Sequence, residues 1–317
     1  MSASESRAPV IVIGGPTASG KTALAIELAL RFAGEIVNAD SMQIYRGMDV
    51  GTAKPSAAER ARVPHHLLDI VAPDEPYHAA RFAADAAAAI DAIRARARIP
   101  FLVGGTGLYI RAALYGLSAG VGRNESLRSA LEAEHTRALR AGDPARLHRR
   151  LAEVDPESAQ RLHPNDLVRI VRALEIHAET GRSASDVFRE RVARARYRAL
   201  YLALEPGRDA LAARIDARCE AMIAGGLLQE VRALRDAGYG PELASMRAIG
   251  YRHMQPVIDG LDTLANVLDA LKRDTRQFAR RQRTWLRGEA GVVWVDPADS
   301  AGCAARVEDF LAARVAA

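Results

Sequence analysis

Residues 15–22 read Gly15-Pro16-Thr17-Ala18-Ser19-Gly20-Lys21-Thr22, and they follow directly on the apolar run at residues 10–13. They fit the pattern G-x-x-x-x-G-K-[ST], in which glycines let the backbone wrap around an anion so that successive N–H groups point inward. A helix-like stretch follows, and its dipole adds partial positive charge at the loop. Lys21 can neutralise a terminal phosphate and the Thr22 hydroxyl can hold Mg²⁺. An ordinary glycine-rich turn is the alternative, but strand, loop and helix together favour a site for a di- or triphosphate.

Length and composition are those of a globular protein with more than one part. The chain has 317 residues, of which 49% are hydrophobic and 26% charged, enough for an α/β core and a second subdomain. No stretch approaches the roughly twenty apolar residues that span a bilayer, and the first seven residues lack the hydrophobic core of a signal peptide. Cys219 and Cys303 lie far apart, which argues against a zinc site or a disulfide framework. We expect a cytoplasmic monomer with no membrane partner.

The charge pattern is compatible with a nucleic-acid partner. The formal net charge is +5, and 41 of the 44 basic residues are arginine because lysine occurs only at positions 21, 54 and 272. Arginine binds phosphate bidentately and stacks on bases. Five arginines fall at steps of three and four and so share one face of a helix: Arg273, Arg276, Arg280, Arg283 and Arg287. This arginine stripe has three interpretations, namely a solvated face, a surface for RNA phosphates, or support for the protein core.

The order of apolar segments predicts an α/β fold with a parallel sheet. Candidate strands lie at residues 10–13, 35–38, 66–71, 100–103, 198–204 and 292–295, with alanine-rich helices such as 79–98 between them. Residues 118–198 interrupt this alternation with helix-like segments and no convincing strand. We therefore expect a core with the phosphate loop in residues 1–117, an all-helical insertion at 118–198 and the rest of the core in 199–317. Backbone freedom at the start of the insertion comes from Gly116, Gly120 and Gly122.

Two further segments are expected beside the phosphate loop. Ligands of an open parallel sheet gather at the carboxyl ends of its strands. Asp40 begins the segment after the second strand, and Thr106 lies in the glycine-rich segment after the fourth. A carboxylate and a hydroxyl would therefore face the bound phosphates. The alternatives are a helix cap or a secondary Mg²⁺ ligand for Asp40, and a simple turn residue for Thr106.

These and other motifs together resemble the tRNA dimethylallyltransferase family. The motifs occur in family order over nearly the whole chain, at residues 15–22, 40–55, 64–69, 104–109, 163–166 with Arg169, Arg172 and Glu175, 246–252 and 280–286. The resemblance implies transfer of a dimethylallyl group from dimethylallyl diphosphate to the exocyclic N6 of the adenosine 3′ of the anticodon, position 37. The tRNAs would be those that read codons beginning with U, and the products N6-isopentenyladenosine and diphosphate.

The resemblance also assigns roles at the expected site. Residues 15–22 would bind the diphosphate of the donor, which is the leaving group, with Mg²⁺ near Thr22 as the cofactor. Because the lone pair of N6 is delocalised into the adenine ring, a base that removes its proton should help, and we choose Asp40. Thr106 would position the diphosphate or the nucleophile. An arginine of segment 214–218 would hold the donor, and we favour Arg218 over Arg214.

The partner implied is the anticodon stem-loop of tRNA, with the target base turned out into the protein. The resemblance assigns the contacts to three segments and one further arginine. They comprise Asp40, Ser41, Met42, Gln43, Arg128, Val168, Arg169, Ile170, Val171, Arg172, Arg247, Ala248, Ile249, Gly250, Tyr251 and Arg252. Residues 119–126, which lead to Arg128, depart from the proline-containing stretch usual in the family.

Rival classes share the phosphate loop. A small-molecule kinase would not require the arginine-rich insertion or the 247–252 segment. A guanine-nucleotide switch needs Asn-Lys-x-Asp to read its base, and none of the three lysines follows an asparagine. An enzyme that prenylates free adenine nucleotides and a non-catalytic RNA-binding NTPase are further alternatives, against which the insertion and Asp40 respectively argue.

Overall fold

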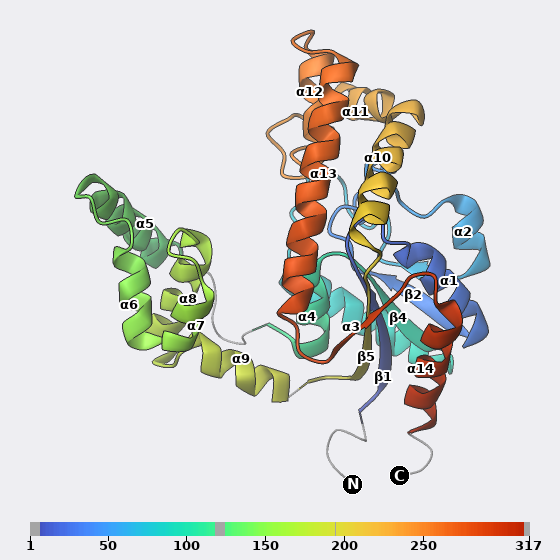
Figure 1. Ribbon diagram of the computed structural model, residues 1–317, viewed down its shortest axis with the longest axis horizontal. Coiled ribbons are helices and arrows are strands. Elements are labelled where there is room, and N and C mark those ends of the chain that lie inside the picture. The colour runs from blue at the N-terminus through green and yellow to red at the C-terminus, as the bar shows by residue number, and fades with distance from the viewer. Residues whose placement is uncertain (1–6, 118–123, 194, 314–317) are drawn as a thin grey trace. The chain divides into compact units, whose positions relative to one another are not determined.

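A computed structural model describes residues 7–117, 124–193 and 195–313 of the chain (Figure 1). Its compact units are residues 1–114 with 196–317, here the core unit, and residues 115–195, here the helical unit. No strand occurs among the described residues of the helical unit, as the sequence predicts. Gly116 has a φ of +75°, whereas Gly120 and Gly122 lie outside the described residues.

The core unit is built on one parallel sheet of six strands in the order β3-β2-β4-β1-β5-β6. Their bounds are β1 Pro9–Gly14, β2 Gly34–Asn38, β3 His65–His66, β4 Ile99–Gly104, β5 Arg198–Leu204 and β6 Val292–Val295. The central strands are buried on both faces, which explains their continuous runs of apolar residues. The predicted α/β class is therefore confirmed.

Helices connect the strands and extend beyond them. In the core unit these are α1 Lys21–Arg31, α2 Ala57–Arg62, α3 Ala79–Ala95, α4 Gly107–Tyr115, α10 Arg208–Ala224, α11 Leu227–Asp236, α12 Tyr251–Ile258, α13 Leu264–Arg287 and α14 Ser300–Ala312. In the helical unit they are α5 Glu125–Arg140, α6 Arg146–Val154, α7 Pro156–Arg161, α8 Leu167–Thr180 and α9 Ala184–Ala193. Helices α10, α11, α12 and α13 pack on one another away from the sheet (Figure 1).

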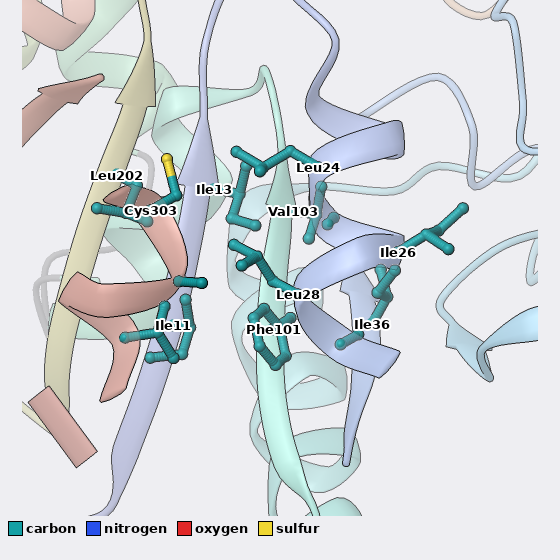
Figure 2. Close-up of a cluster of buried hydrophobic side chains, with 14 of the residues drawn as sticks. Ile11, Ile13, Leu24, Ile26, Leu28, Ile36, Phe101, Val103, Leu202 and Cys303 are labelled. Atoms are coloured by element: carbon teal, nitrogen blue, oxygen red, sulfur yellow. The ribbon is translucent and has the colours of Figure 1, made fainter. Parts of the chain in front are cut away.

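The described part of the core unit includes two hydrophobic clusters with different partners. In the first, Leu24 and Leu28 of α1 and Cys303 of α14 pack on Ile11 and Phe101 of the central strands (Figure 2). The second joins the chain after β2, with Ile44 and Met48, to helices α10 to α13. The segment after β2 is thereby packed against these helices.

The structure corrects the bounds of two predicted elements. The strand expected at 66–71 is only His65–His66, because Leu67 and Asp69 have φ values of +61° and +56°, which no extended strand accommodates. Beyond them a single parallel bridge joins Tyr45 to Val71. The helix expected to run to residue 98 ends at Ala95.

Candidate functional site

The phosphate loop joins β1 to α1 in the predicted way. Gly20 precedes the helix with a φ of +96°, a conformation that a side chain would strain. The Lys21 ammonium folds back over the loop and donates to the carbonyl oxygens of Gly15 at 3.1 Å and Pro16 at 2.7 Å. The Ser19 hydroxyl is buried and has no hydrogen-bond partner among the residues that the structure describes. Lysine and serine are therefore held where an anion in the loop would meet them.

Lys21 has an unusual proton affinity. Burial, followed by repulsion from the Arg218 guanidinium, lowers the pKa of its ammonium to about 8, although Asp40 acts in the opposite direction. Burial likewise lowers the pKa of Arg218, and Asp40 opposes this too. Lys21, Arg218 and Asp40 all line one cavity, which therefore holds two cations and one carboxylate. An added anion would relieve the repulsion between the cations.

Asp40 and Thr106 are joined through the backbone of the segment after β2. The Thr106 hydroxyl accepts a hydrogen bond from the Ser41 N–H at 3.0 Å and donates to the Ser41 hydroxyl at 3.2 Å. The Asp40 carboxylate accepts from the Met42 N–H at 2.9 Å. The carboxyl ends of β2 and β4 are therefore locked together, and the Asp40 carboxylate is oriented by a local bond.

One cavity of about 800 Å³ joins these groups to helices α10, α12 and α13. Its lining includes Arg214 and Arg218, one turn apart on α10, so the structure places both candidate arginines at the site. Arg218 donates to the Thr52 carbonyl at 3.3 Å. The other sequence-predicted residues that line it are Thr17, Ala18, Ser19, Gly20, Lys21, Thr22, Asp40, Ser41, Met42, Gln43, Thr106, Arg247, Ala248, Ile249, Tyr251 and Arg252.

Gln282 of α13 is a site residue to which the sequence reasoning gave no role. Its side-chain oxygen accepts from the Thr17 N–H at 2.8 Å, and its nitrogen donates to the Gly105 carbonyl at 3.0 Å. A Cβ on Gly105 would come within 2.3 Å of that nitrogen, and one on Gly107 within 2.1 Å of the Trp285 ring. The motif at 280–286 therefore joins the phosphate loop to the loop after β4. Membership of this motif was the sequence signal that could have indicated a role for Gln282.

Glu230 of α11 is a second such residue. It accepts hydrogen bonds from the N–H groups of Asp49, Val50 and Gly51 and from the Tyr251 hydroxyl. Tyr251 is fully buried. Tyr251 is one of the residues predicted to bind tRNA, and in the structure its hydroxyl helps Glu230 to hold the turn at residues 49–51.

The arginine stripe of α13 is largely engaged with acidic side chains of the core unit. Arg276 forms two-pronged hydrogen bonds to Asp216 of α10, at 2.6 and 2.7 Å. Arg283 and Arg287 both reach Glu205, which follows β5. The cavity is lined by a different face of α13, which carries Thr275, Phe278, Arg281 and Gln282 among others. These ion pairs support the interpretation in which the stripe braces the core.

The remaining residues predicted to bind tRNA lie in the helical unit, and they differ in exposure. Val168 is 75% exposed and Arg169 is exposed beside it, whereas Arg128 and Arg172 are half-buried. Segment 168–172, which is predicted to bind tRNA, therefore contains both exposed and buried side chains. The side chains of Ile170 and Val171 point into the core of the unit, 1% and 2% exposed, because helical periodicity turns them inward.

Oxygen donors for a hard cation exist at the phosphate loop. The Thr22 hydroxyl and the Asp40 carboxylate line the same cavity, and Mg²⁺ prefers such ligands together with phosphate oxygens. No group of three His, Cys, Asp or Glu side chains suited to a metal occurs in residues 7–117, 124–193 and 195–313. Within the same ranges no helix is both long and apolar enough to cross a membrane.

The sequence of the chain matches known protein families and individual proteins. The pattern of the IPP transferase family matches residues 43–289, and that of the Isopentenyl transferase family matches residues 8–69. A tRNA dimethylallyltransferase of Anaeromyxobacter dehalogenans (strain 2CP-C) is 55% identical over 301 residues, which cover 94% of this chain and 99% of that protein. The tRNA dimethylallyltransferase 2 of Geotalea uraniireducens (strain Rf4) is 50% identical over 297 residues, 93% of this chain and 94% of that one.

Solved structures agree with these relatives. The tRNA isopentenylpyrophosphate transferase of Bacillus halodurans is 40% identical, with a TM-score of 0.70 and 96% of both chains covered. A eukaryotic dimethylallyltransferase, described in crystallographic snapshots of its action on tRNA, is 30% identical, with a TM-score of 0.76 over 96% of this chain and 80% of that one. The match to a family pattern over most of the sequence, with relatives of this identity along nearly all of it, confirms the resemblance: the chain belongs to the IPP transferase family.

Proposed function

We propose that this protein transfers a dimethylallyl group from dimethylallyl diphosphate to the exocyclic N6 of adenosine 37, next to the anticodon, in tRNAs that read codons beginning with U. The observation that carries the proposal is the single cavity in which the phosphate loop, Asp40, Thr106 and Arg218 lie together with Arg247 and Arg252. Such a transfer requires a binding site for the diphosphate, a base, and positively charged side chains that bind the RNA.

The donor's diphosphate occupies the phosphate loop in this proposal. As the bond between the prenyl carbon and oxygen breaks, negative charge grows on the leaving diphosphate. The loop N–H groups, Lys21 and Arg218 stabilise that charge, and the buried Ser19 hydroxyl gains an acceptor. Mg²⁺, held by the Thr22 hydroxyl and the phosphates, would supply further positive charge. Thr106 keeps the loop after β4 in register with Asp40.

Asp40 is the proposed base. The N6 proton becomes acidic as the new carbon–nitrogen bond forms, and the Asp40 carboxylate accepts it. The hydrogen bond from the Met42 N–H orients the carboxylate.

The tRNA contacts come from both units. In the core unit the exposed edges of segments 40–43 and 247–252 meet the anticodon loop around the cavity. In the helical unit Arg128, Val168, Arg169 and Arg172 present the accessible side chains. The enzyme would act as a monomer in the cytoplasm.

The test uses labelled dimethylallyl diphosphate, with unmodified tRNA and AMP as competing acceptors. We expect label in tRNA and none in AMP. The AMP arm matters because the Isopentenyl transferase pattern matches the first part of the chain. Label in AMP alone would mean that the protein prenylates free adenine nucleotides instead of tRNA. Label in neither acceptor would refute the proposal.

The lowered pKa of Lys21 predicts a pH dependence of donor binding. A bound diphosphate favours the ammonium, so below the free-enzyme pKa of about 8 no proton has to be taken up. Above it, binding must first protonate the amine, and affinity should fall by up to about tenfold per pH unit. Calorimetric titration with dimethylallyl diphosphate from about pH 7.5 to about pH 9.5 measures this. Lys21→Ala should bind weakly without the same decline, and a flat wild-type profile would contradict the assignment.

The ion pairs of the arginine stripe predict a structural effect of its removal. We expect Arg276→Gln with Arg283→Gln to lower the melting temperature by about 2–6 °C, since two partly exposed pairs of modest energy are lost. The salt dependence of tRNA binding should not change, because Arg276 and Arg283 lie on a different face of α13 from the one that lines the cavity. A log–log salt slope reduced by about 0.7 to 0.9 per arginine would instead show contacts to RNA phosphates.

A further inference from the structure

Glu175 of α8 is a buried carboxylate to which the proposed mechanism gives no role. Its side chain is 0% exposed, and three residues donate hydrogen bonds to it. The Asn124 N–H lies 2.7 Å away, and Arg128 donates from Nε at 3.0 Å and Nη2 at 2.9 Å. Arg172 adds a fourth bond from Nη1. One carboxylate therefore holds the start of α5 and two arginines.

This carboxylate remains charged over the working range of pH. Burial alone would raise its pKa, but the hydrogen bonds from Arg128, Arg172 and the Asn124 N–H outweigh burial and hold the pKa of Glu175 at about 2. A buried charge without partners is costly, so the two guanidinium groups are kept on it. The two-pronged bond to Arg128 also fixes the plane of that guanidinium.

The fixed arginines lie beside accessible side chains of the same helix. Val168 and Arg169 are exposed in the first turn of α8, and Arg172 follows one turn later. Arg128 joins them from α5 through Glu175. Bidentate attachment through Nε and Nη2 leaves the Nη1 side of Arg128 directed away from the carboxylate.

We propose that Glu175 is a positioning residue for tRNA, which holds Arg128 and Arg172 in the orientation in which they meet RNA phosphates. The inference rests on the proposed function, because it requires that the helical unit bind tRNA. Preorganised arginines lose little side-chain entropy when a phosphate arrives. The competing explanation is that Glu175 only ties α5 to α8.

The two explanations differ in the sign of one substitution. Glu175→Gln keeps the size of the side chain but removes a negative charge from an RNA-binding unit. By electrostatics alone, tRNA binding should become tighter. If Glu175 positions the arginines, binding becomes weaker despite the added positive charge, because the guanidinium groups lose their common anchor.

Glu134 offers a matched control in the same unit. It also bridges two arginines, accepting from Arg146 at 3.1 Å and Arg150 at 3.0 Å, but it is partly exposed. Prenyl transfer is measured with the full-length protein, unmodified tRNA and dimethylallyl diphosphate. We expect Glu175→Gln to raise KM for tRNA roughly fivefold or more, with kcat and the KM for the donor changed less than about twofold. Glu134→Gln should leave the KM for tRNA unchanged or lower it.

A second variant guards against a simple loss of folding. Arg128→Lys keeps the charge and loses the two-pronged bond. As a single variant it should raise the KM for tRNA, and in combination with Glu175→Gln it should raise that KM little further. Circular dichroism at the assay temperature establishes whether each variant is folded. A folded Glu175→Gln protein with unchanged or lower KM for tRNA overturns the inference. If that variant is unfolded, an unchanged KM in Arg128→Lys overturns it. Wild-type protein that transfers nothing to tRNA would instead refute the proposed function.

Discussion

Replacing Asp40 by asparagine is expected to lower the single-turnover rate of transfer by at least about a hundredfold, because proton removal from N6 loses its acceptor. Asparagine is the informative substitution. It retains a side-chain oxygen that can accept the hydrogen bond from the Met42 N–H, so the segment after β2 keeps its conformation. The affinity for tRNA should therefore change little, as filter binding would show.

The control for this variant is Asp236→Asn, an exposed aspartate at the end of α11. It should transfer at the wild-type rate. If Asp40→Asn also reacts at near the wild-type rate, Asp40 is not the base. If its rate falls only in step with lost tRNA affinity, Asp40 is a binding residue.

Lys21→Ala is expected to slow transfer by about a hundredfold to a thousandfold and to raise the KM for dimethylallyl diphosphate. The ammonium donates to the carbonyls of Gly15 and Pro16 in the loop that is proposed to bind the leaving diphosphate. Its loss leaves the charge of that diphosphate uncompensated, while tRNA affinity should remain. Quenched-flow measurement with saturating tRNA separates the two effects.

The same variant distinguishes a prenyltransferase from the NTPases that share the loop. Wild-type protein should neither hydrolyse ATP nor require it for transfer. ATP hydrolysis that is rapid in the wild type and lost in Lys21→Ala would assign the loop to a kinase or NTPase.

Local sequence signals predicted the sheet and the phosphate loop well. Runs of apolar residues mark β1 and β4 because these strands are buried on both faces, and they mark β5, whose last four residues are buried. The length of β3 was predicted wrongly, because the left-handed conformations of Leu67 and Asp69 follow from their surroundings and not from residue type. The placement of Asp40 and Thr106 at one cavity was predictable because parallel strands end at a common edge.

Contacts between distant segments could not be read from the sequence. Periodicity placed five arginines on one face of α13, but it could not show that Asp216 and Glu205 would lie opposite them. The sequence likewise could not show that the Gln282 side chain accepts a hydrogen bond from the Thr17 N–H of the phosphate loop. Ile170 and Val171 are different, because their apolar character and helical spacing already indicated a buried face.

The central claim is tested most directly by locating the modification. Unmodified tRNA that reads a U-starting codon is incubated with the protein and dimethylallyl diphosphate, digested with a ribonuclease and examined by mass spectrometry. The account predicts one dimethylallyl group, on N6 of adenosine 37, and none when that adenosine is replaced by guanosine. A dimethylallyl group at another nucleotide, or transfer that persists after the replacement, would contradict it.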